Sequence, residues 1–280
     1  MAKLFQPTVV IGLGGTGKGV LLALKKMIAE NSPNGMADYP LLKLLSIDTS
    51  IVIDETSSSI QTIGKNELNL GREKEICSLH ADFNIVPDLK DFPDIASWFP
   101  EKLRHYLTPS ELETGAGQRK PIGRFSFAWN AEAVRSRIEN ALRSPVDNET
   151  SRRAAIGSSN LSSYTNVFIC GSVCGGTCSG IFLDVAYLVR FIASSLNRNV
   201  YIYGLLALSS IFEGIEGDAQ VKPNCYASLL ELDHFMNPMN HANVHRRFFP
   251  AYKNIGMGQW NYSKSSEKFF TIPKELAEYE

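Results

Sequence analysis

The chain has 280 residues, of which 44% are hydrophobic and 20% are charged, and its formal net charge is −1. This length and composition are typical of a globular protein with a sizeable core, in one large domain or two small ones. The near-zero charge removes the simplest electrostatic argument for binding nucleic acid or a membrane surface, and no apolar segment reaches the ~20 residues of a membrane helix. We therefore expect a cytoplasmic protein with no nucleic-acid partner and no membrane insertion.

The first part of the chain predicts a strand, a loop, a helix and a second strand. Residues 8–13 are apolar and β-branched, as in a buried strand. Residues 17–30 have helical spacing, and residues 41–47 form a second apolar run that closes on Asp48. Such a βαβ unit places its two strands parallel in one sheet.

The later elements continue this order after a polar middle section. We expect a helix over residues 125–142, a strand over 166–171, a helix over 181–196, a strand over 200–208 and a helix that starts near Asn224. The order predicts an α/β fold, with a three-layer, Rossmann-like, mostly parallel sheet and helices on both faces. Ligands of such sheets bind outside the carboxyl ends of the strands, so the loops that follow the strands can converge on one site.

The cysteines give no sign of a metal site. Their odd number in a chain that we expect to be cytoplasmic indicates free thiols. Cys170, Cys174 and Cys178 are four residues apart, which is not the C-x-x-C-like spacing of structural zinc sites, and no histidine lies near them in the sequence. We therefore predict no metal held by protein ligands alone.

The first glycine-rich loop, GLGGTGKG, fits several phosphate-binding patterns. Gly12, Gly14 and Gly17 spell G-x-G-x-x-G, the dinucleotide pattern. Gly12, Gly17 and Lys18 spell G-x-x-x-x-G-K, but Gly19 stands where a P-loop needs the hydroxyl that binds magnesium. The loop alone does not decide between these patterns.

A second glycine-rich loop, CGGTCSG at residues 174–180, follows the predicted strand over 166–171. Both loops offer backbone N–H groups at the start of a helix, where the helix dipole also favours an anion. One such loop can serve only a tight turn, but two after parallel strands suit a polyphosphate. A dinucleotide would leave the second loop unexplained, although Asp48 ends the second strand, as a ribose-binding acid would.

Several segments, in order along the chain, resemble the tubulin/FtsZ superfamily, and more narrowly the bacterial tubulin-like proteins with divergent C-terminal halves. GLGGTGKG is similar to the first phosphate loop, and GAGQRKPIGR at 115–124 resembles the FtsZ loop near the terminal phosphate. SVCGGTCSG at 172–180 resembles the signature GGGTGSG, with cysteines in place of two glycines. FEG at 212–214 is similar to the ribose-binding turn, and PNCYASLLELDHF at 223–235 resembles the start of the central helix.

The resemblance implies a role for each matching residue. The residues expected to hold phosphates are Gly12, Gly14, Gly15, Thr16, Lys18, Gly175, Gly176 and Thr177. The residues expected near the γ-phosphate are Gly115, Ala116 and Gly117. Asp48 is expected to contact magnesium or water, and Glu213 to hydrogen-bond the ribose. Asn224 is expected to favour guanine, and Tyr226 to stack on the base.

The resemblance also implies a function. It predicts a protein that binds GTP or GDP with Mg²⁺ and assembles head to tail, with the nucleotide at the subunit interface. The nucleotide-binding domain would span residues 1–236 and end with the central helix, and a C-terminal extension would span 237–280.

Hydrolysis in the family needs acidic residues from a loop after the central helix, and no matching stretch follows Asp233. GTPase activity would then need an acid from an unrecognised loop or a neighbouring subunit, and no catalytic residue is assigned. A nucleotide-gated interaction module without turnover and an NAD(P)-dependent Rossmann protein are the alternatives.

Overall fold

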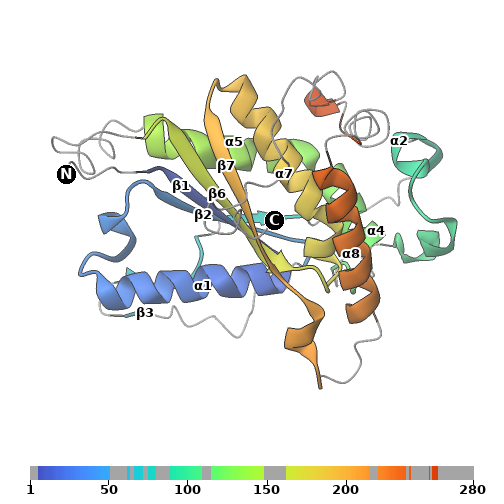
Figure 1. Cartoon of the computed structure of the whole chain (residues 1–280), viewed down its shortest axis with the longest axis horizontal. Helices are drawn as coiled ribbons and strands as arrows, with labels where there is room; N and C mark the ends of the chain where they lie inside the picture. Colours follow the sequence, from blue (N-terminus) through green and yellow to red (C-terminus); the bar gives the residue numbers. More distant parts are fainter. Residues whose placement is uncertain are drawn as a thin grey trace.

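A five-stranded parallel sheet forms the centre of the protein, in the order β5-β2-β1-β6-β7 (Figure 1). Its strands are β1 (Thr8–Leu13), β2 (Leu42–Asp48), β5 (Ile76–Ser78), β6 (Tyr164–Ser172) and β7 (Asn199–Ala207). The computed structural model describes residues 6–50, 62–63, 66–71, 75–79, 89–91, 93–108, 115–147, 162–214, 220–237, 240, 252 and 254–257. The sheet confirms the predicted α/β class.

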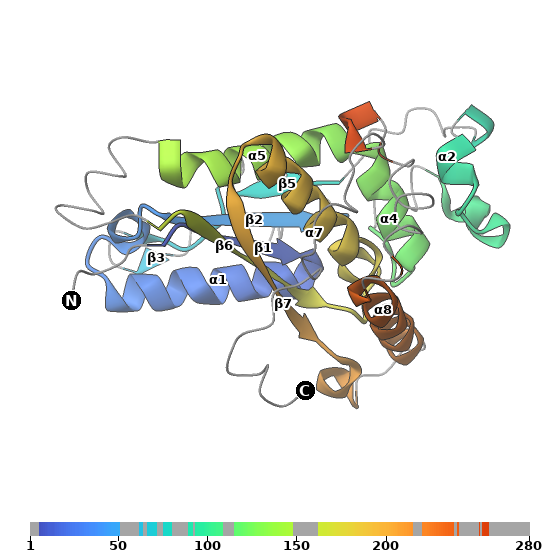
Figure 2. The ribbon, with the colours of Figure 1, turned by 45° about the horizontal axis from the view of Figure 1, so that its top comes forward.

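Helices cover both faces of the sheet, which gives the predicted three layers (Figure 2). On one face, α1 (Gly14–Asn31) packs against β1, β2 and β6. On the other face, α5 (Ala131–Asp147) packs against β1, β2 and β5, and α7 (Thr177–Ser195) against β1, β6 and β7. Two further helices, α4 (Lys120–Trp129) and α8 (Val221–Met236), pack against α7.

The remaining described elements are short. They are η1 (Gly35–Asp38), β3 (Thr62–Ile63), β4 (Asn66–Glu67), η3 (Leu89–Asp91), α2 (Pro93–Ala96), η4 (Glu101–Tyr106) and η5 (Ser209–Phe212). Strands β3 and β4 form a separate antiparallel pair.

The central strand β1 is buried on both faces of the sheet. Its successive side chains point to opposite sides, and both sets lie in a hydrophobic core. Val9, Ile11 and Leu13 belong to the large core shared with α5 and α7. Val10 belongs to a smaller core under α1, which also contains Leu21. This two-sided burial explains why the sequence of β1 reads as a continuous apolar run.

Helix α7 is long and apolar enough to cross a membrane by length and composition, and it is the one such helix among the described residues. The sequence predicts a helix over residues 181–196 here, shorter than the ~20 apolar residues of a membrane helix. Within the fold, 83% of its most apolar window is buried, as in the central helix of a packed domain.

Two element predictions need correction. The single helix expected over residues 125–142 is two helices, α4 and α5, which are separated at Asn130. The side-chain amide of Asn130 donates hydrogen bonds to the carbonyl oxygens of Leu79 (3.0 Å) and Ser126 (2.8 Å), which holds the break in place. The last helix, α8, begins at Val221 rather than near Asn224.

The carboxyl ends of the three central strands lie level with one another. Leu13 at the end of β1 pairs with Ile47 of β2 and with Gly171 of β6. Asp48 and Ser172 are therefore the next residues on either side of the turn into α1. The register brings the start of α1, the end of β2 and the loop after β6 to one edge of the sheet.

Candidate functional site

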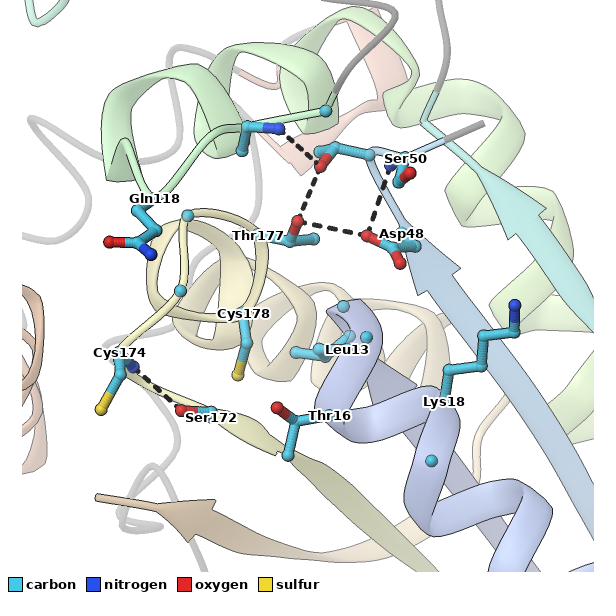
Figure 3. A pocket seen from close by; sticks show the side chains of 18 of the residues that line it. Leu13, Thr16, Lys18, Asp48, Ser50, Gln118, Ser172, Cys174, Thr177 and Cys178 are labelled. Atoms are coloured by element: carbon cyan, nitrogen blue, oxygen red, sulfur yellow. Dashed lines mark hydrogen bonds between the residues drawn. The ribbon is translucent and has the colours of Figure 1, made fainter. Parts of the chain in front are cut away.

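A cavity of about 560 Å³ lies at this edge of the sheet (Figure 3). Most of the residues that the sequence predicts for nucleotide binding line it, namely Gly14, Gly15, Thr16, Lys18, Asp48, Gly115, Ala116, Gly117, Gly175, Gly176 and Thr177. The two glycine-rich loops and the loop at 115–118 are thus brought together, as the order of the strands implies.

The first helix start follows β1 without an intervening loop. Gly14 has a φ of +66°, which glycine adopts without strain, and this allows the chain to turn from the strand directly into α1. Gly12 does not line the cavity. A Cβ added at Gly12 would lie 2.5 Å from the carbonyl oxygen of Gly17, so these two glycines allow α1 to pack closely on β1.

The second helix start, at Thr177 of α7, is in contact with the first. A Cβ added at Gly14 would lie 3.3 Å from the Cβ of Thr177. The unpaired N–H groups and the positive dipole ends of two helices therefore face one cavity. A Cβ added at Gly15 or at Gly175 would meet nothing within 4 Å, so both of these cavity-lining glycines have open space beside them.

A chain of hydrogen bonds joins three of the segments around the cavity. The hydroxyl of Thr177 donates to Asp48 Oδ1 (3.2 Å), and the hydroxyl oxygens of Thr177 and Thr49 lie 2.7 Å apart (Figure 3). The backbone N–H of Ala116 donates to Thr49 Oγ1 (3.0 Å). The end of β2, the start of α7 and the loop at 115–118 therefore hold one another in position.

Asp48 is partly buried in the cavity wall. Burial raises the pKa of its carboxyl, while hydrogen bonds from the backbone N–H groups of Ser50 and Thr49 and from Thr177, together with the charge of Lys18, oppose that increase. Its carboxylate and the two threonine hydroxyls are oxygen donors of the kind that Mg²⁺ prefers. Among the described residues no group of three or more His, Cys, Asp or Glu could hold a metal, so a cation here would also need oxygen atoms from a ligand.

The loop at 115–118 is strongly curved. Gly115 and Gly117 have φ values of +92° and +51°, and Gln118 has a φ of +59°. The loop packs directly on the start of α7, because a Cβ added at Gly176 would lie 2.7 Å from the Cβ of Ala116. This contact requires glycine at position 176 for packing, independently of any ligand.

The residues predicted to contact the ribose and base do not line the cavity. Glu213 is exposed, although the preceding residue, Phe212, is part of the lining. Tyr226 is 67% exposed on α8. Asn224 is 7% exposed, and its side-chain amide donates to two backbone carbonyls of the adjacent loops. Their roles at the ribose and base stay predictions.

Some lining residues were not singled out from the sequence. Thr49 and Ser50 directly follow Asp48 at the end of a strand, and Gln118 follows the GAG of its loop, so their positions were available signals. Phe212 and Val221 carry no chemical pattern that would mark them.

Two cysteines, Cys174 and Cys178, also line the cavity wall. Both are buried free thiols, and burial raises the pKa of Cys178 well above its ordinary value. The thiolate is therefore disfavoured, so Cys178 has the character of a small packing residue and not of a nucleophile.

Comparisons with known proteins show what the chain is similar to. A family model described as "Tubulin like" matches residues 9–270. A GTPγS-bound protofilament of CetZ2 from Haloferax volcanii is 15% identical with a TM-score of 0.39, and the match covers 81% of this chain and 45% of that chain. CetZ from Methanosaeta thermophila is 14% identical with a TM-score of 0.41, and the match covers 98% of this chain and 59% of that chain. The chain thus spans about half the length of these two proteins. No curated protein matches the sequence.

Proposed function

The chain belongs to the tubulin-like family, and from this premise we propose that it binds GTP or GDP with the phosphates in the cavity at the carboxyl edge of the sheet. The observation that carries the proposal is the contact between the starts of α1 and α7 at Gly14 and Thr177. Two helix starts that face one space supply N–H donors and dipoles for more than one phosphate group.

The surrounding side chains support the same ligand class. Lys18 lines the cavity and adds a positive charge beside it. Gly15 and Gly175 leave the space that a phosphate oxygen would fill against the backbone. Where Mg²⁺ accompanies the nucleotide, Asp48 would hold it together with phosphate oxygens, and the ion would neutralise phosphate charge.

The preference for guanine is a separate part of the proposal. It rests on the family resemblance of Glu213, Asn224 and Tyr226, none of which is among the residues that line the cavity. Phosphate binding and base selection can therefore succeed or fail independently.

We also propose head-to-tail self-association with the nucleotide at the interface, on the basis of family membership. A heterologous interface that doesn't close on itself produces open filaments. Sedimentation and electron microscopy with GTP, GDP and no nucleotide test this part. Particles of unchanged size in all three conditions would contradict it.

One observation favours binding without turnover by a single subunit. Among the described residues that line the cavity, Asp48 is the one acidic residue. In-line hydrolysis needs a positioned water as well as a phosphate cradle, so a second acid would have to come from elsewhere. A phosphate-release assay at increasing protein concentration separates the two cases, because a GTPase completed by a neighbouring subunit becomes faster per molecule as subunits associate.

Calorimetric titration with GTP, ATP and NADH, with and without Mg²⁺, tests the central proposal. We expect Gly175→Ala to weaken GTP binding by roughly 10- to 100-fold, because its methyl group occupies ligand space and disturbs charge-assisted hydrogen bonds. Gly71→Ala is the matched control, since Gly71 is exposed, lies outside the cavity and has room for a Cβ. Tight NADH binding, or GTP binding that Gly175→Ala leaves intact, would contradict the proposal.

A further inference from the structure

Helix α8 presents a polar stripe to two loops of the cavity wall, at residues 115–118 and 172–176. Asn224, Ser228 and Glu231 are separated by four and three residues, which places them on one face of the helix. Asn224 and Ser228 are almost completely buried, at 7% and 1% exposure. Tyr226, Leu229 and Leu230, by contrast, are exposed on the rest of the helix surface.

Asn224 connects both loops to α8. Its side-chain nitrogen donates to the carbonyl oxygen of Gln118 at 2.7 Å and to that of Cys174 at 2.9 Å. Both acceptors belong to residues that line the cavity. The same amide group therefore fixes the distance between the loop at 115–118 and the loop after β6.

Lys120 makes the second connection, one turn further along the stripe. Its ammonium group donates to the carbonyl oxygen of Ser179 at 2.8 Å, to Ser228 Oγ at 2.7 Å and to Glu231 Oε2 at 2.9 Å. The lysine side chain is 14% exposed. All three donors of a largely buried ammonium are thus used to join the start of α4, the first turn of α7 and α8.

We propose that this polar stripe, Asn224, Ser228 and Glu231 with Lys120, positions the phosphate-binding loops. Lys120 and Asn224 are positioning residues that set the separation of the loops at 115–118 and 172–176. The expected effect on ligand affinity rests on the proposed function. The effect of Lys120 and Asn224 on the separation of the loops does not depend on any nucleotide. The amide hydrogens of Asn224 are donated to carbonyl oxygens, so this positioning task is separate from the contact with guanine that is proposed for the same residue.

Lys120→Met tests the lysine, because it keeps the aliphatic volume and removes the three donors. Lys26→Met is the matched control, since Lys26 pairs with Glu30 on the exposed side of α1 at 3.9 Å. Hydrogen exchange of the nucleotide-free proteins is measured first. We expect Lys120→Met to speed amide exchange at 115–118 and 172–176 but not in β1, and Lys26→Met to change neither.

A second experiment measures the binding affinity for GTP and for inorganic tripolyphosphate, which has no base. We expect Lys120→Met and Asn224→Ala each to weaken the binding of both ligands by about tenfold, and to the same extent. If Asn224→Ala instead weakens the binding of GTP and leaves the binding of tripolyphosphate unchanged, the residue acts on the base and not on the loops. That result would overturn the inference for Asn224. If Lys120→Met and Asn224→Ala both leave amide exchange at 115–118 and 172–176 unchanged, the inference is overturned for the whole polar stripe.

The two proposals fail in different ways. Wild-type protein that binds neither GTP nor tripolyphosphate would remove the proposed function, while the exchange measurement would still decide whether the stripe holds the loops. If Lys120→Met does not fold, Ser228→Ala and Asn224→Ala carry the same exchange measurement, because each removes a different contact of the stripe.

Discussion

At the scale of single residues, the glycines in and next to the cavity wall include two kinds that the sequence alone does not distinguish. Gly12, Gly17 and Gly176 are sites where an added Cβ would collide with neighbouring backbone or side-chain atoms. Gly15 and Gly175 face open space. The resemblance predicted phosphate contact for glycines of both groups, because a motif records the residue type and not the neighbour that requires it.

Asp48 gives a residue-scale prediction about pH. Burial raises the pKa of its carboxyl above the ordinary value of 3.8. The ionised form is therefore less favourable in the folded protein, so its cost to stability is absent below pH 3.8 and is complete once the pH has passed the folded pKa. We expect Asp48→Asn to increase the free energy of unfolding at pH 7, by less than about 1 kcal/mol because the site is partly open to solvent.

Denaturant unfolding at pH 4 and pH 7 measures this difference for the wild type and Asp48→Asn, and the gain should shrink at pH 4. In the same variant we expect the enhancement of GTP binding by Mg²⁺ to decrease, because the carboxylate charge is gone. An equal gain in stability at both pH values would show that the ionisation of Asp48 is not the cause.

At the scale of elements, the sequence predicted the strands and helices whose patterns are local. β1 is a continuous apolar run followed directly by the glycines of α1, and the apolar part of β6 precedes the glycine-rich loop that leads into α7. The break at Asn130 was missed because it depends on a hydrogen bond to Leu79, far away in the chain. β5 has three residues, Ile76–Ser78, too few to show an alternating pattern.

The contact between α4 and α7 gives an element-scale prediction. A Cβ added at Gly123 would lie 2.3 Å from the carbonyl oxygen of Gly176, and one added at Gly180 would lie 2.5 Å from that of Lys120. We expect Gly123→Ala to force the helices apart and to lower the free energy of unfolding by about 1–3 kcal/mol. It should also weaken GTP binding, because Gly176 lies in the cavity wall.

Thermal unfolding and calorimetry of Gly123→Ala, compared with Gly71→Ala, measure both effects. Alanine favours helix formation over glycine, so a purely local effect would stabilise α4. An increase in melting temperature would therefore show that the two helices can separate without cost.

At the scale of the whole molecule, residues beyond α8 pack into the main core. Tyr252, Ile255 and Met257 are buried there, and Tyr252 packs edge-on against Phe127. The phenol of Tyr252 also donates to Asp184, which forms a buried ion pair with Arg124 at 3.2 Å. The sequence of this region shows no clean period, and contacts between residues 68 positions apart leave no local pattern. The predicted domain boundary after residue 236 stays a prediction.

This packing provides the last prediction, which tests whether residues 237–280 are separable from the domain. Among the described residues, deleting them would remove the buried side chains of Tyr252, Ile255 and Met257, and an apolar side chain contributes about 1.5–3 kcal/mol when fully buried. It would also take a hydrogen-bond donor away from the buried carboxylate of Asp184, whose pKa burial already raises. We therefore expect the deletion to lower the melting temperature by more than 10 °C, or to prevent folding, since several kcal/mol is a large part of the stability of a domain.

Two point variants separate the contributions in the intact chain. Tyr252→Phe should cost about 1.5–3 kcal/mol, because it removes one hydrogen bond to a charged group, and Tyr252→Ala about 3–5 kcal/mol, because it also leaves a cavity against Phe127. Chemical unfolding of the three proteins checks the order wild type, Tyr252→Phe, Tyr252→Ala. A deletion protein as stable as the wild type would show that the core closes without this segment, and the domain would then end at α8.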